Sequence, residues 1–229
     1  LIGDSHAGAL EFNLNEEIKQ NDLSLFRFAT GMYLTDFNML TKNKPNQINK
    51  PFIENIARID NFLEKNSNLI VVFHQRWSLR LLEKRFDNEE GFEEFIGDPE
   101  YNVYLEPIDI KTSSLKERQK YIREGLVAQI NKIVNQGHKL ILVYPVPEMG
   151  ISPGRHLFRN FLVNKNLFEN SIPIFSGSYE VYKKRNKLIF EILDNIKSPN
   201  IHRVYPHKLF CDKQIENRCV GNTENNLFY

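Results

Sequence analysis

Short apolar stretches alternate with longer segments of helical period along this chain, and this alternation constrains the fold more than any other feature. The segments between the apolar stretches space their hydrophobic residues as amphipathic helices do. Strands that alternate with helices predict a mostly parallel sheet with helices on both faces. We therefore expect an α/β fold, a three-layer sandwich around a five-stranded sheet. The expected strands are Leu1 to Gly3, Leu23 to Ala29, "NLIVVFHQRW", "HKLILVYPVPE" and "IHRVYPHKLF".

Four helices are expected between these strands. The clearest spans Leu115 to Gln136, with Gly137 placed as its C-terminal stop. A second covers roughly Tyr179 to Lys197, and a third follows the first strand directly. The fourth begins near Pro51, which a first helical turn tolerates. Its expected apolar stripe is Ile53, Ile56, Asp60 and Leu63.

The segment from Ser78 to Ser114 does not fit this alternation. It is charged and aromatic, it is punctuated by Gly and Pro, and it is too long for a plain connection. We interpret residues 78–114 as an inserted region beside the active face of the sheet. With 229 residues the whole chain suits one domain, residues 1–229.

Composition and charge exclude several classes of function. The net charge is +1, which provides no strong electrostatic field for nucleic acid. The longest apolar runs, such as Leu69 to Phe73, are far shorter than the roughly 20 residues of a membrane-spanning helix. Because the sequence opens at Leu1 inside an expected strand, with no signal peptide, we expect a domain of a longer protein.

Ser5, in the opening phrase "LIGDSHAGAL", is the first candidate for chemistry. In an open α/β sheet, ligands bind outside the carboxyl ends of the strands, and residues Asp4 to His6 fall at that edge. The backbone N–H of Ser5 would lie at a helix N-terminus, where developing negative charge is stabilised. The alternative is that Ser5 only caps the helix, a common role of serine.

Five phrases occur at the ends of expected strands, in one order along nearly the whole chain. They are "LIGDSHAGAL", "FATGMY", "FHQRWS", "LVYPVPEMGISPGR" and "KLFC" followed by a second cysteine. This ordered set resembles the SGNH (GDSL-like) esterase and acyltransferase superfamily. More closely, it resembles the SGNH domain fused to acyltransferase family three membrane proteins, which O-acylate bacterial surface polysaccharides. The resemblance implies a flavodoxin-like SGNH hydrolase fold.

The resemblance implies roles for individual residues. Ser5 would be the nucleophile, and the backbone amides of Ser5 and Gly31 would stabilise the oxyanion. A glycine also lets backbone approach a reacting carbonyl closely, although Gly31 could equally be a turn residue. The superfamily's third donor, an asparagine, is replaced here by Gln75-Arg76-Trp77. Arg76 or Gln75 would take that role, or Arg76 would contact substrate; the alternative is an ion-paired Arg76 beside a Trp77 packed in the core.

A serine nucleophile needs a base, and the family supplies it from a D-x-x-H motif near the C-terminus of the domain. None of the six histidines here has Asp three residues before it. We expect the catalytic Asp and His beyond Tyr229. The alternatives are a degenerate site, or a base drawn from His6 or His74, both near strand ends. His138 precedes the fourth strand, at the other edge, and is expected to be structural.

Two further features have open interpretations. The resemblance implies a disulfide between Cys211 and Cys219, whereas two reduced thiols would fit a cytosolic protein. The prolines around Glu148, Pro145, Pro147 and Pro153, predict a stiff loop at the active edge. This loop would shape an acceptor site, or it would serve only as a rigid connection.

The leading functional hypothesis is an O-acyltransferase domain that passes an acyl group, expected to be acetyl, through a Ser5 ester to a cell-surface polysaccharide. The alternatives are a carbohydrate esterase and a non-catalytic glycan-binding module. We expect no cofactor, because there is no metal cluster and no nucleotide-binding glycine motif. The expected partners are a glycan acceptor and a donor delivered by an N-terminal membrane acyltransferase domain, with no nucleic acid. The resemblance implies an extracytoplasmic, periplasmic location.

Overall fold

The computed structural model describes residues 1–29, 31–91, 102–150 and 174–223, and the chain forms two compact units. The prediction of a single domain over residues 1–229 stays a prediction. The first unit comprises Leu1–Glu83, Tyr101–Pro145 and Leu188–Val204. The second comprises Lys84–Glu100, Val146–Lys187 and Tyr205–Tyr229.

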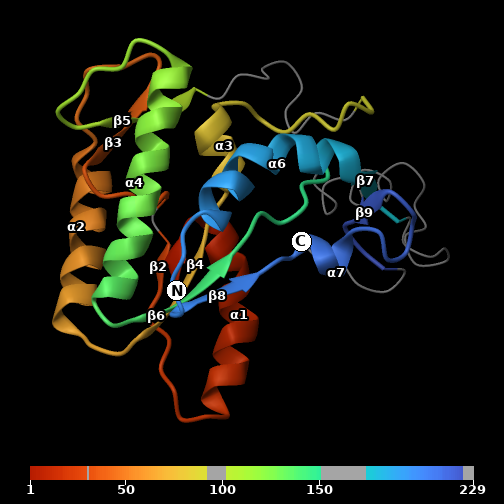
Figure 1. Ribbon diagram of the computed structural model, residues 1–229, viewed down its shortest axis with the longest axis horizontal. Coiled ribbons are helices and arrows are strands. Elements are labelled where there is room, and N and C mark those ends of the chain that lie inside the picture. The colour runs from red at the N-terminus through yellow and green to blue at the C-terminus, as the bar shows by residue number, and fades with distance from the viewer. Residues whose placement is uncertain (30, 92–101, 151–173, 224–229) are drawn as a thin grey trace, which may run out of the picture. The chain divides into compact units, whose positions relative to one another are not determined.

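A five-stranded parallel sheet forms the centre of the first unit (Figure 1). Its strand order, β2-β1-β4-β6-β8, corresponds to 2-1-3-4-5 when these five strands are numbered along the chain. This is the flavodoxin-like order, so the predicted α/β fold is confirmed. The strands are β1 (Ile2–Gly3), β2 (Phe28–Ala29), β4 (Ile70–His74), β6 (Lys139–Val143) and β8 (Ile201–Val204).

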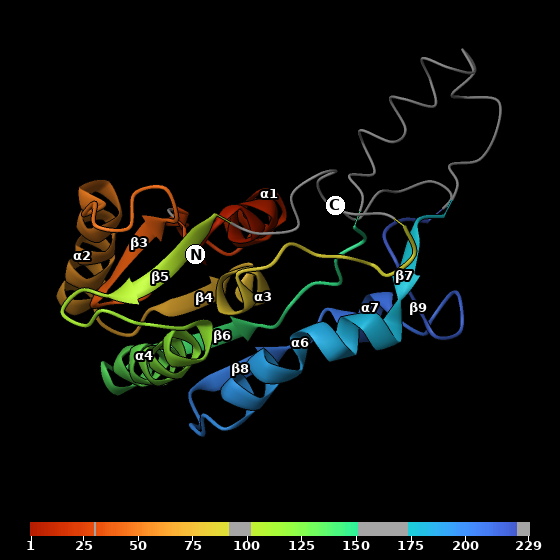
Figure 2. The same ribbon diagram turned by 90° about the horizontal axis from the view of Figure 1, so that it is seen from above.

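Helices cover both faces of the sheet, as right-handed crossovers require. Figure 2 shows α1 (Ser5–Lys19) on one side of the strands and α4 (Leu115–Asn135) on the other. The remaining helices of the first unit are α2 (Lys50–Lys65), the short α3 (Trp77–Leu82) and the last part of α6 (Tyr179–Asp194). Ser114 caps α4 by accepting a hydrogen bond from the Glu117 backbone N–H, and Asn49 caps α2 in the same way.

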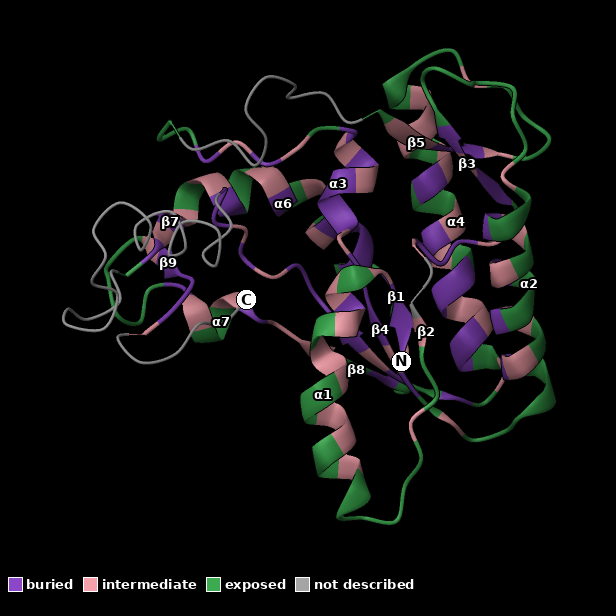
Figure 3. Ribbon diagram, turned by 180° about the vertical axis from the view of Figure 1, so that it is seen from behind, coloured by how far each residue is buried: buried purple, intermediate pink, exposed green. Residues whose placement is uncertain are grey.

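The core of the first unit lies between the sheet and the apolar stripes of α2 and α4, which Figure 3 colours purple. The predicted stripe of α4 is confirmed, since its residues from Ile122 to Val134 are fully or nearly fully buried. The predicted stripe of α2 is corrected in part. Asp60 does not belong to the apolar set, because the buried apolar residues are Phe52, Ile56, Ile59 and Leu63.

A small antiparallel sheet in the first unit escaped prediction. It pairs β3 (Phe37–Thr41) with β5 (Val103–Pro107), in register from Phe37 opposite Pro107 to Thr41 opposite Val103. The predicted inserted region, 78–114, therefore contains α3 except its first residue, Trp77, and also contains β5, which pairs with a strand far away in sequence. Its residues 92–101 lie outside the described part of the chain.

The second unit contains a short antiparallel pair, β7 (Ser176–Ser178) and β9 (Arg218–Val220), and the helix α7 (His207–Phe210). The prediction of one strand across "IHRVYPHKLF" was wrong in its second half, because Pro206 is the N-cap residue of α7, which begins at His207. Cys211 and Cys219 form a disulfide that connects α7 to β9. In the described parts of both units, no helix is long and apolar enough to cross a membrane.

Candidate active site

Three of the predicted site residues follow one rung of the central sheet. In this rung Gly3 of β1 pairs with Ala29 of β2 on one side and with His74 of β4 on the other. Ser5, Gly31 and Arg76 each lie two residues beyond their rung position. Because all three strands are parallel, the structure brings these residues to the same edge, the carboxyl ends of the strands.

Asp4 connects two of these strand ends. One carboxylate oxygen accepts a hydrogen bond from the His6 backbone N–H at 2.9 Å and caps α1. The other accepts a hydrogen bond from the Arg76 backbone N–H at 2.8 Å. Asp4 thus fixes the start of α1, where Ser5 lies, against the start of α3. No local sequence pattern predicts this role of the Asp4 carboxylate.

Gly3 permits the close approach of β1 to β4. It has φ +150°, and a Cβ atom at this position would lie 1.6 Å from the His74 carbonyl oxygen. No side chain fits such a gap, because the obstacle is backbone. The glycine of the "GDSH" phrase is therefore required by the packing of the two strands that carry Ser5 and Arg76.

Ser5 is the first residue of α1 and is exposed to solvent. The alternative that Ser5 caps the helix is not what the structure has, since Asp4 occupies the N-cap position. Among the described residues, none accepts a hydrogen bond from the Ser5 hydroxyl and none donates one to it. The hydroxyl is thus accessible at a helix N-terminus, where orphan N–H groups favour negative charge.

Gly31 lies in the loop after β2, with φ +111°, a conformation that glycine adopts readily. Two residues further on, the Tyr33 backbone N–H donates a hydrogen bond to Gln75 Oε1 at 3.2 Å. The Gln75 side chain is buried, and its Nε2 has no hydrogen-bond partner in the described part of the chain. Gln75 thus connects the Gly31 loop to the end of β4.

A buried polar network holds the same loop from its other side. Tyr33 donates its hydroxyl hydrogen to Asp60 at 2.5 Å, and Thr35 donates to the second Asp60 oxygen at 3.1 Å. Lys132 of α4 lies 3.2 Å from the Asp60 carboxylate. Burial, together with the hydrogen bond to Asp60, raises the pKa of Tyr33, so its hydroxyl remains a donor. Asp60, a carboxylate among the apolar residues of the expected stripe of α2, was the sequence feature that indicated such a network.

Arg76 is half-buried and precedes α3 as its N-cap residue. The prediction that its side chain stabilises the oxyanion or contacts substrate stays a prediction. Trp77 is packed in the core, 1% exposed, as one alternative for this phrase anticipated. Its indole N–H donates to the Val143 carbonyl oxygen at 3.0 Å, and its ring packs edge-on against Phe73.

Of the two histidines near the strand ends, His74 is poorly suited to act as a base. His74 is 1% exposed, and its Nδ1 lies 3.2 Å from the Val143 carbonyl oxygen, which can only accept a hydrogen bond. Burial, with a smaller contribution from His6, lowers the pKa of His74 to about 4. The His6 and His74 rings lie 5.8 Å apart. His74 is therefore neutral at neutral pH and a weak base.

The remaining candidates lie away from this edge or in the second unit. His138 is fully buried between the Leu69 N–H and the Leu63 carbonyl, which fits the structural role expected for it. Glu148 forms an ion pair with Arg185 at 2.6 Å within the second unit. Pro153 of the predicted stiff loop lies outside the described residues. No group of His, Cys, Asp and Glu in the described segments has the arrangement of a metal site.

A flavodoxin-like sheet with an accessible serine at the carboxyl end of β1 defines a class of α/β protein whose candidate chemistry is acyl transfer or ester hydrolysis. The chain belongs to the SGNH domain family, described as the SGNH domain fused to AT3 domains, which matches residues 1–229. This confirms the predicted family and supports a function of acyltransferase or esterase type. No curated protein and no solved structure matched the chain.

Proposed function

We propose that this protein is an O-acyltransferase domain that moves an acyl group, acetyl in the simplest case, through a Ser5 ester to a hydroxyl of a bacterial cell-surface polysaccharide. The observation that carries the proposal is that Ser5, Gly31 and Arg76 each lie two residues after one of three paired strand residues, Gly3, Ala29 and His74. Membership of a family of domains fused to AT3 domains supports it.

In the proposed reaction the Ser5 Oγ attacks the carbonyl carbon of an acyl donor while a base accepts the hydroxyl proton. The backbone N–H groups of Ser5 and Gly31 stabilise the tetrahedral oxyanion, and Arg76 adds positive charge. Collapse expels the donor's leaving group, which takes the proton, and leaves an acyl-serine ester. A sugar hydroxyl then attacks this ester, which releases Ser5 and completes the transfer.

The base in this proposal is a histidine of an Asp-x-x-His pair beyond Tyr229, as the resemblance implies. The histidines near Ser5 are poorer candidates. Neighbouring residues on a helix point in different directions, so His6 and Ser5 do not face each other. His74 has a lowered pKa of about 4 and is buried.

The proposal also includes the setting of the reaction. The AT3 domain to which this family is fused would deliver the acyl donor across the membrane to an extracytoplasmic, periplasmic site. Hydrolysis remains the second candidate, because Ser5 is exposed to solvent and water would compete with the sugar hydroxyl for the acyl-serine ester.

The test is mass spectrometry of Ser5 in a longer form of the chain that continues past Tyr229, incubated with an acetyl donor. We expect an acetyl group on Ser5 that disappears on addition of a glycan acceptor, with acetate on the glycan rather than in solution. Ser5→Ala is the matched control and should carry no adduct. Free acetate as the main product would instead establish an esterase. If Ser5 formed no adduct and a fluorophosphonate did not label it in the folded protein, the catalytic proposal would fail in favour of a binding module.

A further inference from the structure

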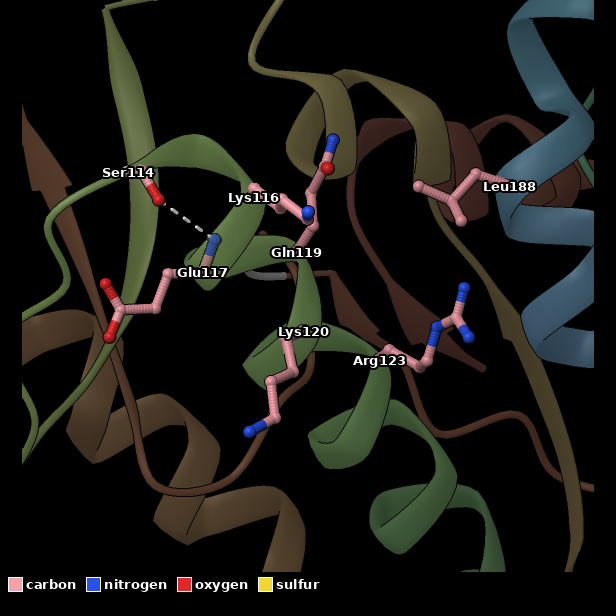
Figure 4. Close-up of a pocket in the computed structure, with 7 residues that line it drawn as sticks. All are labelled: Ser114, Lys116, Glu117, Gln119, Lys120, Arg123 and Leu188. Atoms are coloured by element: carbon pink, nitrogen blue, oxygen red, sulfur yellow. Dashed lines mark hydrogen bonds between the residues drawn. The ribbon is translucent and has the colours of Figure 1, made fainter.

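A pocket of about 560 Å³ lies beside the N-terminal half of α4 in the first unit (Figure 4). Its volume is within the range of small-ligand sites. Figure 4 shows Leu188 of α6 on one side of the pocket and the side chains of α4 on the other. The lining residues are Ser114, Lys116, Glu117, Gln119, Lys120, Arg123 and Leu188.

The charge of this pocket is predominantly positive. Lys116, Lys120 and Arg123 are exposed and follow one another at i, i+4 and i+7, so they share a face of α4. None of the three forms an ion pair with an acid in the described part of the chain. In contrast, Arg118 of the same helix is paired with Glu83 at 2.6 Å.

Glu117 is the acidic residue of the pocket, and its carboxylate accepts hydrogen bonds from Ser113, which lies just before α4. One oxygen accepts hydrogen bonds from the Ser113 backbone N–H at 2.7 Å and from the Ser113 hydroxyl at 2.9 Å. These bonds lower the pKa of Glu117. Three cations and one anion leave the lining with a net charge of about +2, to which the N-terminal end of the helix dipole adds.

The pocket lies beyond the carboxyl edge of the central sheet, the same edge at which the candidate active site is located. α4 has 21 residues and is about 31 Å long, whereas the five residues of β6 span about 17 Å. Because α4 ends at the start of β6, its first turns extend past the carboxyl edge of the sheet. Gln119 also donates a hydrogen bond to the Leu81 carbonyl oxygen of α3, the helix that begins directly after Arg76.

We propose that this pocket binds an anionic group, a carboxylate or a phosphate, carried by the polysaccharide acceptor, and that Leu188 contacts the apolar face of a sugar ring. The inference rests on the proposed function, since it assigns the acceptor a negative charge. It predicts that neutral glycans are poorer acceptors than acidic ones of the same length.

The test is binding, measured by isothermal titration calorimetry, and needs no catalysis. Three probes are compared: an oligogalacturonate, its neutral methyl-esterified counterpart, and a glycerol-phosphate oligomer. We expect at least one anionic probe to bind about tenfold or more tightly than the neutral one, with an affinity that falls as salt rises. Preference for the first or the third probe identifies the anionic group as a carboxylate or a phosphate.

The variant Lys116→Gln/Lys120→Gln/Arg123→Gln should lose about tenfold or more of that affinity. Its matched control is Lys50→Gln/Arg58→Gln/Lys65→Gln, which removes two lysines and an arginine from exposed positions of α2. Circular dichroism verifies that both variants are folded. Equal affinity for charged and neutral probes, or an equal loss in the control, would overturn the inference.

The outcome is separable from that of the proposed function. If the unchanged protein forms the Ser5 adduct but does not discriminate between the probes, the pocket inference fails and acyl transfer stands. If it binds an anionic probe through the three cations but Ser5 carries no adduct, the anion site stands and the proposed reaction fails.

Discussion

Substitution of Asp4 tests whether one carboxylate holds the two halves of the candidate site together. Asp4→Ala removes two interactions that the structure defines, the α1 cap and the hydrogen bond to the Arg76 N–H. Loss of an N-cap costs about 1 kcal/mol. Loss of a hydrogen bond to a charged group costs about 1.5–3 kcal/mol. Since Asp4 is only half-buried, we expect the free energy of unfolding to fall by about 2–3 kcal/mol.

Asp4→Asn separates the two interactions. The amide has one oxygen where the carboxylate has two, so it can satisfy the His6 N–H or the Arg76 N–H but not both with the original geometry. We expect a loss of about 1–2 kcal/mol, intermediate between the unchanged protein and Asp4→Ala. Asp109→Ala, at an exposed position of the first unit, is the control and should change stability by less than about 0.5 kcal/mol.

The assay is urea unfolding followed by tryptophan fluorescence. Trp77 is the single tryptophan of the chain, is buried, and directly follows Arg76, so its emission reports on this region. Fluorophosphonate labelling of Ser5, in the same variants of the longer form that continues past Tyr229, measures the effect on the site. If Asp4→Ala unfolded at the same urea concentration as Asp109→Ala, the carboxylate would not connect the two strand ends as described.

Two further predictions concern pH and redox state. The folded-state pKa of His74, about 4, lies below the unfolded value of 6.5, so the unfolded chain takes up the proton first as pH falls. Unfolding free energy should therefore drop between pH 6.5 and pH 4, by up to about 3 kcal/mol, and His74→Gln should flatten this part of the urea-midpoint profile; an unchanged profile would refute the assignment. Reduction of the Cys211–Cys219 disulfide should destabilise the second unit by about 2–3 kcal/mol. Hydrogen exchange of the β9 amides should then accelerate with dithiothreitol and in the double serine variant, and protection that survives reduction would contradict this.

The strongly periodic parts of the fold were predictable from sequence. The helix expected from Leu115 to Gln136 is α4, which ends one residue earlier, because its apolar stripe and terminal glycine are local signals. The parallel sheet also follows from helices that alternate with short strands, whereas its flavodoxin-like order was implied by the family resemblance. β3 and β5 were missed, because they pair across more than 60 residues of sequence and neither carries a local hairpin signal. Pro206 offered a signal that the expected fifth strand was too long.

The candidate site was predictable where a residue is a candidate for the chemistry, and less so where a residue holds another in place. Ser5, Gly31 and Arg76 were singled out by the phrases at the ends of the expected strands. Asp4 and Gln75 act through backbone N–H groups more than 40 residues away in sequence, and no local pattern reports such a bond. Sequence reasoning therefore finds candidate reacting groups more readily than the groups that hold them in place.

The location of these positioning residues follows from the topology. The chain leaves β1 for β2 on one side and returns to β4 on the other, so the junction of β1 and β4 is the topological switch point of the sheet. Open α/β sheets bind ligands at such a switch point, and hydrogen bonds across it hold the strand ends in place. Asp4 bridges β1 to β4, and Gln75 bridges β4 to the loop after β2, so each strand end that carries a candidate residue is fixed to a neighbour. Gly3 has the complementary role, because the absence of a side chain lets the two strands approach closely enough for the Asp4 bridge to form.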